Sequence, residues 1–320
     1  MTHLTINIPA LSKASVDRAE DLRESVRLHA AWSTARMLRV APNGEFVTMI
    51  GRDGLHLVTE LAAGRDSAPP ADAVLLGSFG GVDYWAMVDD VAANLIDGAV
   101  EGLSTVRVAG PLLPDGEAVL ATTAVALLGW HRGAGFCSRC GSRTEPDLSG
   151  HSRICSSGHQ EFPRLDPAVI VLVHDDADHA VLARQPSWAP GRFSVLAGFA
   201  EAGESLEETV AREIGEEVGL AVDDVEYLGS QPWPFPRSLM IAFSARAPHG
   251  ATLRPRPGEI AEARWFSRSE LAAVLHDANN DAKNDANTGS VGGRSTISGI
   301  TLPGPVSIAR RMVEAFVNAS

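Results

Sequence analysis

Residues 198–220 constrain this chain more than any other stretch, because they combine a glycine-rich turn with a short acidic helix. They read GFAEAGESLEETVAREIGEEVGL. Ser205, with Glu208 three residues later, forms the pattern of a capping box and indicates where a helix begins. Gly219 follows at the position where a left-handed cap favours glycine. The stretch therefore predicts a helix from Ser205 to Val218.

One face of this helix is apolar and the neighbouring face carries three carboxylates. The apolar stripe recurs every four residues, at Leu206, Val210, Ile214 and Val218. Glu213, Glu216 and Glu217 stand at i, i+3 and i+4, which places their Cβ atoms about 5–6 Å apart. A solvated acidic face is the ordinary explanation of such a pattern. Mg²⁺ or Mn²⁺ would relieve the repulsion, since hard cations prefer carboxylate oxygens, so the cluster is also a candidate metal site.

Other residues of the stretch support the same site. Arg212 adjoins the carboxylates and is expected to hold one of them through a bidentate pair, with Glu204 as a second anchor. Gly198 and Gly203 bracket a loop that must turn sharply and let backbone approach a ligand. Gly215 lies inside the helix, where glycine costs about 1 kcal/mol relative to alanine. A close backbone approach on that side would explain it.

The complete pattern resembles the Nudix box: Gly, five residues, Glu, seven residues, Arg-Glu, an apolar residue, any residue, Glu-Glu, any residue, Gly and an apolar residue. The resemblance implies an α+β fold, with a mixed sheet between helices. It implies hydrolysis of a nucleoside diphosphate linked to another moiety, through divalent metals that activate a water. The implied metal ligands are Glu213, Glu216, Glu217 and the Ala197 carbonyl. Arg212 joins them in the catalytic set, and Glu216 is our choice of general base.

Residues 230–240, SQPWPFPRSLM, form a second unusual stretch. Three prolines alternate with Trp233 and Phe235, and proline stiffens a loop by fixing φ. Rigid aromatic rings present flat faces to a nucleobase or a nicotinamide ring at a low ordering cost. The alternative is a proline-rich connector whose aromatic rings fill the core. The residues alone leave both interpretations open.

The segment S-Q-P-W-P-F-P, one residue, then Ser is similar to a pattern that follows the box in NADH pyrophosphatases, a branch of the Nudix hydrolases. The resemblance covers roughly residues 131–320. It implies a homodimer that hydrolyses NADH or NAD⁺ to nicotinamide mononucleotide and AMP and removes NAD caps from RNA 5′ ends. Glu259 would complete the metal shell. The implied substrate-binding residues are Phe199, Gln231, Pro232, Trp233, Pro234, Phe235, Pro236, Arg237, Ser238, Ala309 and Phe162, the last reaching the substrate of a second subunit.

Position 237 departs from the branch, where glutamine is common. Arg237 adds a cation there, and we hypothesise that it favours a substrate with extra phosphate. Two other functions remain alternatives. One is a Nudix hydrolase for ADP-ribose or a diadenosine polyphosphate, which the SQPWPFP loop disfavours. The other is a non-catalytic zinc-ribbon module, which the complete carboxylate set disfavours.

The three cysteines gather in a short, polar segment. Cys137 and Cys140 are spaced C-x-x-C, and Cys155 follows after a turn-rich stretch, which is typical of tetrahedral Zn²⁺ sites. The segment resembles a four-cysteine zinc ribbon that has lost its fourth cysteine. His159 is the expected fourth ligand of one structural zinc ion per subunit, and His151 competes with it. A degenerate ribbon without metal is the alternative.

Composition limits the classes of partner. The net charge is −13, from 40 acidic and 27 basic residues, so nonspecific binding to nucleic acid is disfavoured. Three cysteines, an odd number, argue against a disulfide framework. The N-terminus has no signal-peptide pattern, and the apolar stretch 118–130 is too short to span a membrane. We therefore expect a cytoplasmic protein that does not associate with membranes.

At about 150 residues per domain, the 320 residues predict two domains and a small module. We assign residues 1–130 to a mixed α/β domain, a packing and dimerisation platform, residues 131–165 to the zinc ribbon, and residues 166–320 to a Nudix α/β/α sandwich. Residues 276–298 are expected to form a mobile loop. Strands are predicted at 37–40, 46–50, 55–58, 74–79, 84–88, 168–173, 181–183, 194–197, 225–228, 239–245 and 262–266, and helices at 15–34, 116–129, 205–218, 267–275 and 308–317.

Overall fold

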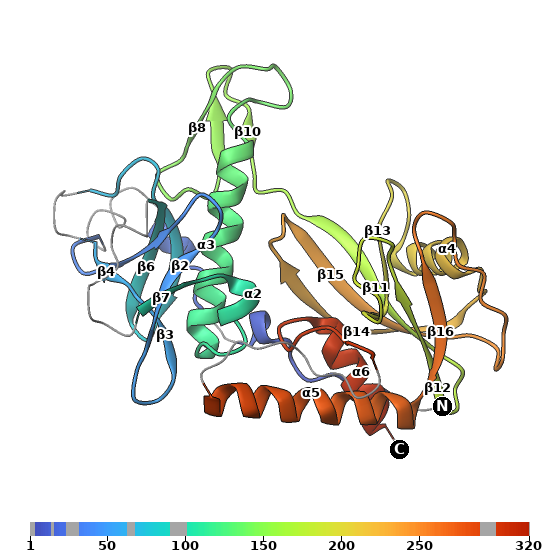
Figure 1. The fold of residues 1–320 in the computed structure, drawn as a ribbon. Helices are drawn as coiled ribbons and strands as arrows, with labels where there is room; N and C mark the ends of the chain where they lie inside the picture. Colours follow the sequence, from blue (N-terminus) through green and yellow to red (C-terminus); the bar gives the residue numbers. More distant parts are fainter. Residues whose placement is uncertain are drawn as a thin grey trace. The chain divides into compact units, whose positions relative to one another are not determined.

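The computed structural model describes residues 4–13, 16–23, 32–62, 68–89, 101–288 and 299–319, without the side chains of residues 22, 101 and 279–288. The chain divides into two compact units. One comprises Met1–Pro9, Asp166–Gln231 and Leu239–Ser320, and the other Ala10–Leu165 and Pro232–Ser238. Both contain sheets and helices, which confirms the predicted mixed α/β class (Figure 1).

The unit that contains Ala10–Leu165 is built on a seven-stranded sheet with the order β3-β2-β1-β6-β5, in which β4 pairs with β1 and β7 with β2. The strands β1 and β6 run parallel. Helix α3 packs against β5 and β6. The elements are η1 (Ala10–Ser12), η2 (Glu20–Arg23), β1 (Arg36–Val40), β2 (Phe46–Ile50), β3 (Leu55–Leu57), β4 (Glu60–Leu61), β5 (Val74–Phe79), β6 (Val82–Val88), β7 (Glu101–Ser104), α2 (Val106–Ala109) and α3 (Asp115–Gly133).

The predicted helix at 15–34 is wrong over residues 16–23, whereas Trp32 is helical. Asp17 instead bridges to Ser78 at the edge of β5, and Ala19 adopts a left-handed φ of 50°. The regular structure there is the short 3-10 turn η2. Residues 14–15 and 24–31 lie outside the described residues. The charge-rich helical spacing was misleading because pairing with the sheet edge satisfies this backbone instead.

The cysteine segment follows α3 in the same unit. It forms a three-stranded antiparallel sheet with the order β10-β9-β8. The strands are short: β8 is Thr144–Pro146, β9 is Arg153–Cys155 and β10 is Gln160–Glu161. So small a sheet has little apolar surface to bury, which is why it needs another source of stability.

The second unit is a six-stranded sheet with the order β14-β15-β11-β12-β16, in which β13 pairs with β11. Alternate residues of β11 enter two separate cores: Val169, Val171 and Val173 join the α4 side, while Ile170 and Leu172 join the side of α5 and α6. The predicted α/β/α sandwich is therefore confirmed. The elements are β11 (Asp166–His174), β12 (His179–Arg184), β13 (Leu196–Phe199), α4 (Leu206–Val218), β14 (Asp223–Trp233), β15 (Ser238–Arg246), β16 (Glu262–Ser267), α5 (Arg268–Thr288) and α6 (Ile308–Asn318).

The loop predicted at 276–298 is wrong over its first half, because α5 continues to Thr288. Asparagine and aspartate are weak helix formers, but the segment also contains alanines, and no proline or glycine interrupts it before Gly289. Residues 289–298 lie outside the described residues. In the described parts of the chain, no helix is both long and apolar enough to cross a membrane.

Candidate metal and substrate site

Helix α4 begins and ends where its sequence predicts. The Ser205 hydroxyl accepts a hydrogen bond from the Glu208 backbone N–H at 3.2 Å, and the Glu208 carboxylate accepts one from the Ser205 N–H at 2.9 Å. Gly219 ends the helix with a φ of 69°. Because Val210, Ile214 and Val218 are buried against the sheet, the rotation of the helix about its axis is set.

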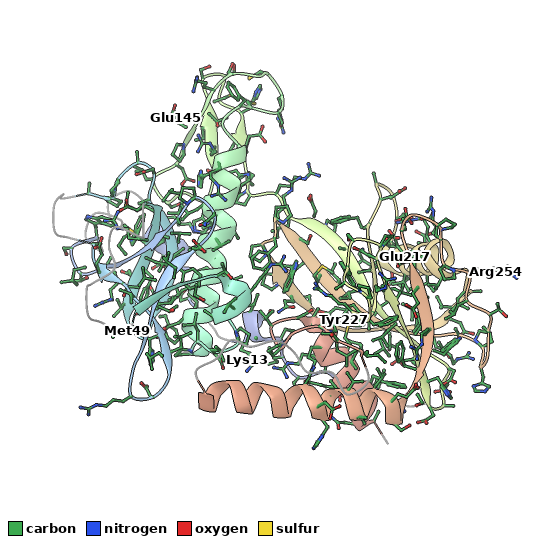
Figure 2. All side chains as sticks on the ribbon, viewed as in Figure 1. Lys13, Met49, Glu145, Glu217, Tyr227 and Arg254 are labelled. Atoms are coloured by element: carbon green, nitrogen blue, oxygen red, sulfur yellow. The ribbon has the colours of Figure 1, made fainter. Side chains whose placement is uncertain are left out.

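Glu217 lies on the inner side of this helix (Figure 2). Only 7% of the residue is exposed, and its Oε2 atom has no hydrogen-bond partner among the described residues. Burial, with the nearby charges of Glu213 and Glu259, raises the pKa of the carboxyl to about 8. A buried acceptor without a donor is costly in a folded protein. A cation bound to this oxygen would remove that cost.

Glu213 lies against the backbone of Gly198 in β13. A Cβ atom at position 198 would come within 1.9 Å of the Glu213 carboxyl carbon. Only glycine leaves this space, so the box glycine is required by the carboxylate rather than by a positive φ. Burial also raises the pKa of Glu213, against the attraction of Arg212.

The Arg212 guanidinium contacts two carboxylates and one backbone carbonyl of the site. Its Nη2 donates to Glu204 Oε2 at 2.9 Å and its Nε to Glu204 Oε1, the bidentate pair that the sequence predicts. The same Nη2 donates to the Phe199 carbonyl at 3.0 Å, and Nη1 lies 3.0 Å from Glu213 Oε1. Hydrogen bonds from Arg212 hold the pKa of Glu204 at about 2. Arg212 thus ties the loop before the helix to the carboxylate face.

Glu216 and Glu259 form the outer part of the cluster. Glu216 Oε2 lies 3.4 Å from Nη1 of Arg212 and 3.4 Å from Nη1 of Arg256, and Glu259 lies 3.4 Å from Arg256. The Arg256 backbone N–H donates to the Glu217 carbonyl at 2.9 Å. The structure therefore places Glu259 beside the three helix carboxylates. Arg256 could not be found from the sequence, since it lies outside both motifs.

The donor set fits a divalent cation that prefers oxygen. Glu217 offers a buried oxygen without a partner among the described residues, and the glycine at 198 leaves room for Glu213. The pKa values of both carboxyls are raised by burial first and by the repulsion of neighbouring carboxylates second, and a bound cation would offset both effects. Residues 196–199 pair with β11 through the register Ile170 to Ala197. This pairing places the Ala197 strand beside α4, which packs on it.

Two glycine substitutions distinguish the need for space beside the Glu213 carboxylate from the effect of glycine on helix propensity. Gly198→Ala should displace the Glu213 carboxylate and lower kcat about 10- to 100-fold, because a misplacement near 1 Å has effects of this size. Gly215→Ala is the matched control, since the nearest atom to its new Cβ would be the Leu220 carbonyl oxygen at an ordinary 3.9 Å. It should raise stability by about 0.5–1 kcal/mol and leave kcat unchanged. Steady-state kinetics and thermal melting measure both effects, and equal activity of the two variants would contradict the space argument.

The open space beside Gly215 also corrects an expectation from the sequence. A close backbone approach does not explain this glycine, because a Cβ atom placed there would meet that one carbonyl oxygen at 3.9 Å and no closer atom. Nothing else among the described residues explains a glycine here.

Gln231 is a positioning residue in the structure. Its side chain is fully buried; Nε2 donates to the Val306 carbonyl at 2.7 Å, and Oε1 accepts from the Ile308 N–H at 2.7 Å. Both amide groups are therefore used in holding the start of α6, where Ala309 is buried. Gln231 connects the end of β14 with the helix that carries Ala309.

The tip of the β14–β15 hairpin carries two aromatic side chains in contact. The Trp233 and Phe235 rings lie edge to face, with centroids 5.1 Å apart and planes at 82°. The Arg107 guanidinium lies over both rings, 4.0 Å from the Phe235 centroid and 4.8 Å from that of Trp233. Arg107 could not be found from the sequence because it lies in a segment without a motif, and only the fold brings it to the hairpin.

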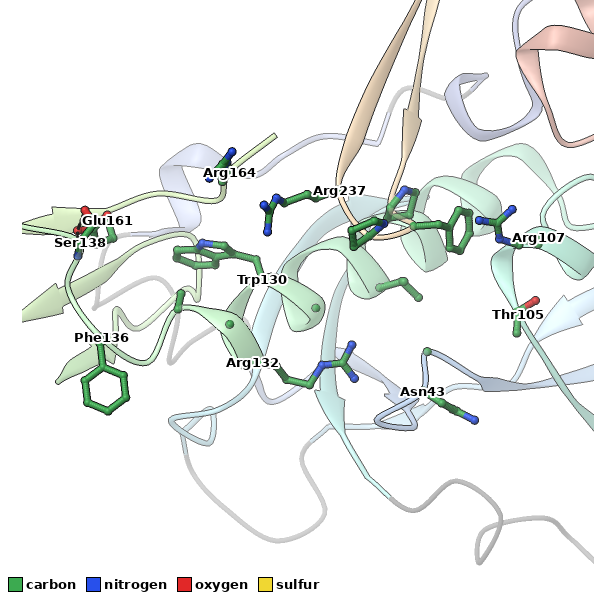
Figure 3. Close-up of a pocket in the computed structure, with 18 residues that line it drawn as sticks. Asn43, Thr105, Arg107, Trp130, Arg132, Phe136, Ser138, Glu161, Arg164 and Arg237 are labelled. Atoms are coloured by element: carbon green, nitrogen blue, oxygen red, sulfur yellow. Dashed lines mark hydrogen bonds between the residues drawn. The ribbon is translucent and has the colours of Figure 1, made fainter. Parts of the chain in front are cut away.

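Phe235 and Arg107 border a cavity of about 540 Å³ that has several arginines in its wall (Figure 3). Trp130 and Arg132 enter it from α3, and Arg237 enters from the hairpin. Arg107 and Arg164 complete the basic wall. A second cavity of about 340 Å³ is bordered by Pro232, Trp233, Pro234, Arg237 and Ser238, with Trp130 also in its wall. In a chain of net charge −13, this local concentration of cations is unusual.

The remaining predicted substrate residues are surface positions or hairpin prolines. Phe199 and Phe162 are exposed apolar rings. Pro234 and Pro236 border the 540 Å³ cavity. An exposed phenylalanine is available to stack on a ligand, since water is a poor environment for its ring.

The cysteine segment brings four donors together. The Sγ atoms of Cys137, Cys140 and Cys155 and a ring nitrogen of His159 lie within 4.8 Å of one another. Cys140 and Cys155 are 3.7 Å apart at sulfur, and Cys137 Sγ lies 3.5 Å from His159 Nδ1. A tetrahedral zinc ion with Zn–S near 2.3 Å requires separations of about 3.8 and 3.5 Å. The geometry therefore fits a Cys₃His zinc site.

The competing ligand His151 is used elsewhere, since its Nε2 lies 2.8 Å from the Leu75 carbonyl oxygen.

The cysteine thiols of the cluster differ in their environment. Hydrogen bonds from Ser142 lower the pKa of Cys140 to about 5, while burial raises the pKa of Cys137. Glu161 accepts hydrogen bonds from the Ser138 backbone N–H at 2.9 Å and hydroxyl at 2.7 Å, which fixes the loop that carries the first two cysteines.

Comparison with known proteins supports both motifs. Residues 164–286 match the NUDIX domain model, and residues 132–161 match the NADH pyrophosphatase zinc ribbon domain. The chain is 44% identical over 321 residues to the NAD-capped RNA hydrolase NudC of Mycobacterium bovis, covering 97% of this chain and 95% of the relative. The similarity thus extends beyond residues 131–320 to nearly the whole chain.

Two further relatives agree. A mitochondrial NAD(P)H pyrophosphatase of Mus musculus is 37% identical over 269 residues, with 79% of this chain and 74% of the relative covered. The NAD-capped RNA hydrolase NudC of Deinococcus radiodurans is 46% identical over 164 residues, with 50% and 58% covered. The names of all three relatives refer to hydrolysis of NAD-capped RNA or of NAD(P)H.

Proposed function

Because the chain belongs to the Nudix hydrolases, in the branch of the NADH pyrophosphatases and NAD-capped RNA hydrolases, we propose that it hydrolyses the pyrophosphate of NADH and NAD⁺. The products are nicotinamide mononucleotide, reduced or oxidised, and AMP. The same reaction on an RNA 5′ end removes an NAD cap. The observation that carries the proposal is the buried, partnerless oxygen of Glu217 beside Glu213, Glu216 and Glu259, in the part of the chain that the structure describes.

We assign Mg²⁺ or Mn²⁺ to the carboxylates Glu213, Glu216, Glu217 and Glu259 and to the Ala197 carbonyl. When bound, such ions neutralise the pyrophosphate charge and lower the pKa of a water molecule. Arg212 holds the loop before α4 against the carboxylate face of the helix, because it donates hydrogen bonds to Glu204 and to the Phe199 carbonyl. Glu216 is the proton acceptor in this proposal, because 44% of its side chain is exposed, against 15% for Glu213.

The hairpin aromatic residues Trp233 and Phe235 supply the flat surface for the nicotinamide or adenine ring, and Phe199 a second one. Pro232, Pro234 and Pro236 keep this surface rigid in the absence of substrate. Ser238, Ala309 and Phe162 complete the substrate-binding set, with Phe162 serving a second subunit of a homodimer. One structural zinc ion per subunit is bound by Cys137, Cys140, Cys155 and His159. We place the enzyme in the cytoplasm.

Arg237 distinguishes between the two forms of substrate in this proposal. Arg237→Gln should lower kcat/KM for NAD-capped RNA about 3- to 10-fold, the effect of losing one solvent-exposed hydrogen bond to phosphate. The value for NADH should stay unchanged, since NADH lacks the additional phosphates. Arg52→Gln, on an exposed turn, is the control. Unchanged kcat/KM values for both substrates would contradict the proposed role of Arg237.

The reaction itself is tested by incubating the protein with NADH and Mn²⁺ and resolving the products by chromatography. AMP and reduced nicotinamide mononucleotide in equal amounts are expected. Hydrolysis of ADP-ribose or diadenosine polyphosphates with NADH left intact would contradict the assignment of substrate. If no dinucleotide is hydrolysed with either metal, the proposed hydrolase activity is contradicted.

A further inference from the structure

A second group of metal-binding side chains lies in the unit that contains the Nudix fold, outside both sites described above. Asp175 Oδ2 is 3.1 Å from His179 Nδ1 and 2.7 Å from His249 Nδ1. The three donor atoms all lie within 4.8 Å of one another. The imidazole rings are 5.8 Å apart at their centroids and inclined at 57°, so they converge on the carboxylate instead of stacking.

The carboxylate is fixed by the backbone around it. Only 1% of the Asp175 side chain is exposed. Its Oδ1 accepts hydrogen bonds from the N–H groups of Ala177 and His179, each at 3.0 Å, which holds the turn between β11 and β12. Oδ2 is thereby directed at the two histidines. Such a fixed outer shell is what orients the ligands of metal sites.

The ligand types, one carboxylate and two imidazoles, suit a transition metal better than a hard cation. Nitrogen and oxygen ligands at about 2.0–2.1 Å from a tetrahedral zinc ion are separated by about 3.3 Å, which is close to the 3.1 Å between Asp175 and His179. The 2.7 Å between Asp175 and His249 is a hydrogen-bond distance, which the exposed His249 ring must lengthen to admit the ion. Two imidazoles exclude Mg²⁺ and Ca²⁺ as preferred ions, since those select oxygen ligands. His249, with 71% of its side chain exposed, leaves the fourth position open to water.

This cluster is separate from the catalytic carboxylates. Ala197 of the Nudix site pairs with Ile170 in β11, whereas Asp175 follows the end of that strand. Five residues of extended chain separate the two positions by about 16 Å. His249 reaches the turn from the segment after β15, where the Ala247 N–H donates to the His174 carbonyl at 2.9 Å.

We propose that Asp175, His179 and His249 form a second zinc site, which ties the β11–β12 turn to the segment after β15. Each chain then binds two zinc ions, one in the ribbon and one here, in addition to the ions of the Nudix box. The two zinc sites share no ligand, so each is lost independently of the other.

The test compares zinc stoichiometry between matched variants at equilibrium. Full-length wild-type protein and the double variant His179→Gln, His249→Gln are dialysed against buffered free Zn²⁺ with excess Mg²⁺, and bound zinc is measured by mass spectrometry. The double variant should bind one zinc ion fewer per chain. His276→Gln, at another exposed histidine of the same unit, is the control and should bind as much zinc as wild type.

A second measurement follows the stability of the turn. Added Zn²⁺ should raise the melting temperature of the wild type more than that of the double variant, since only the wild type gains the additional ligand-linked stabilisation. Both substituted side chains are partly exposed, so the fold should be retained. Equal zinc content in wild type and double variant would overturn the proposal and leave Asp175 as the carboxylate of a purely hydrogen-bonded turn.

Discussion

Replacing Glu217 with glutamine should lower kcat for NADH at least about a hundredfold, because it removes a charged metal ligand from the Nudix site. Glutamine has nearly the same shape, so the packing of α4 is kept. Glu207→Gln, in the exposed first turn of the same helix, is the control and should leave kcat unchanged. Steady-state rates with Mg²⁺ and with Mn²⁺ measure the effect. Full activity of Glu217→Gln with either ion would contradict the assignment of Glu217 as a metal ligand.

The same substitution should stabilise the metal-free protein. The pKa of Glu217 is raised to about 8 from its ordinary value of 4.5, so ionisation disfavours the folded state as pH rises from 4.5 to 8. Glutamine lacks this penalty. Melting temperatures in a chelator should therefore coincide for the two proteins below pH 4.5 and favour the variant by several degrees near pH 8. Opposite effects on activity and stability are expected of a residue kept for function.

Cys137→Ser should remove one zinc ion per chain and lower the melting temperature by about 5–15 °C, because the ribbon has a small sheet and depends on its metal. The zinc content and the melting temperature should both fall. His151→Gln is the matched control, since this histidine contacts the Leu75 carbonyl and not the cluster. Unchanged zinc content and melting temperature in Cys137→Ser would contradict a structural zinc site.

Local sequence was sufficient to predict helix α4. Its capping box, its left-handed Gly219 and its buried face depend on residues only a few positions apart, and all are present in the structure. The pair between Arg212 and Glu204 lies within the same short segment, so it was predictable too. The Cys₃His cluster was predicted from spacing, although spacing alone left His151 as a competitor.

Contacts between distant segments were beyond prediction from sequence. Gln231 is bound by the backbone of Val306 and Ile308, more than seventy positions away, so its positioning role has no local sign. Arg107 lies over the hairpin rings for the same reason. The errors at residues 16–23 and 276–288 arose because polar and charged residues tolerate several backbone states, and tertiary context then decides among them.

The most direct test is a crystal soaked with Mn²⁺ and a non-hydrolysable nicotinamide dinucleotide, with anomalous difference density located at the manganese absorption edge. Density bounded by Glu213, Glu216 and Glu217, next to the Ala197 carbonyl and the pyrophosphate, is the predicted result. Bound dinucleotide with these three side chains free of manganese and directed into solvent would contradict the catalytic role of the helix.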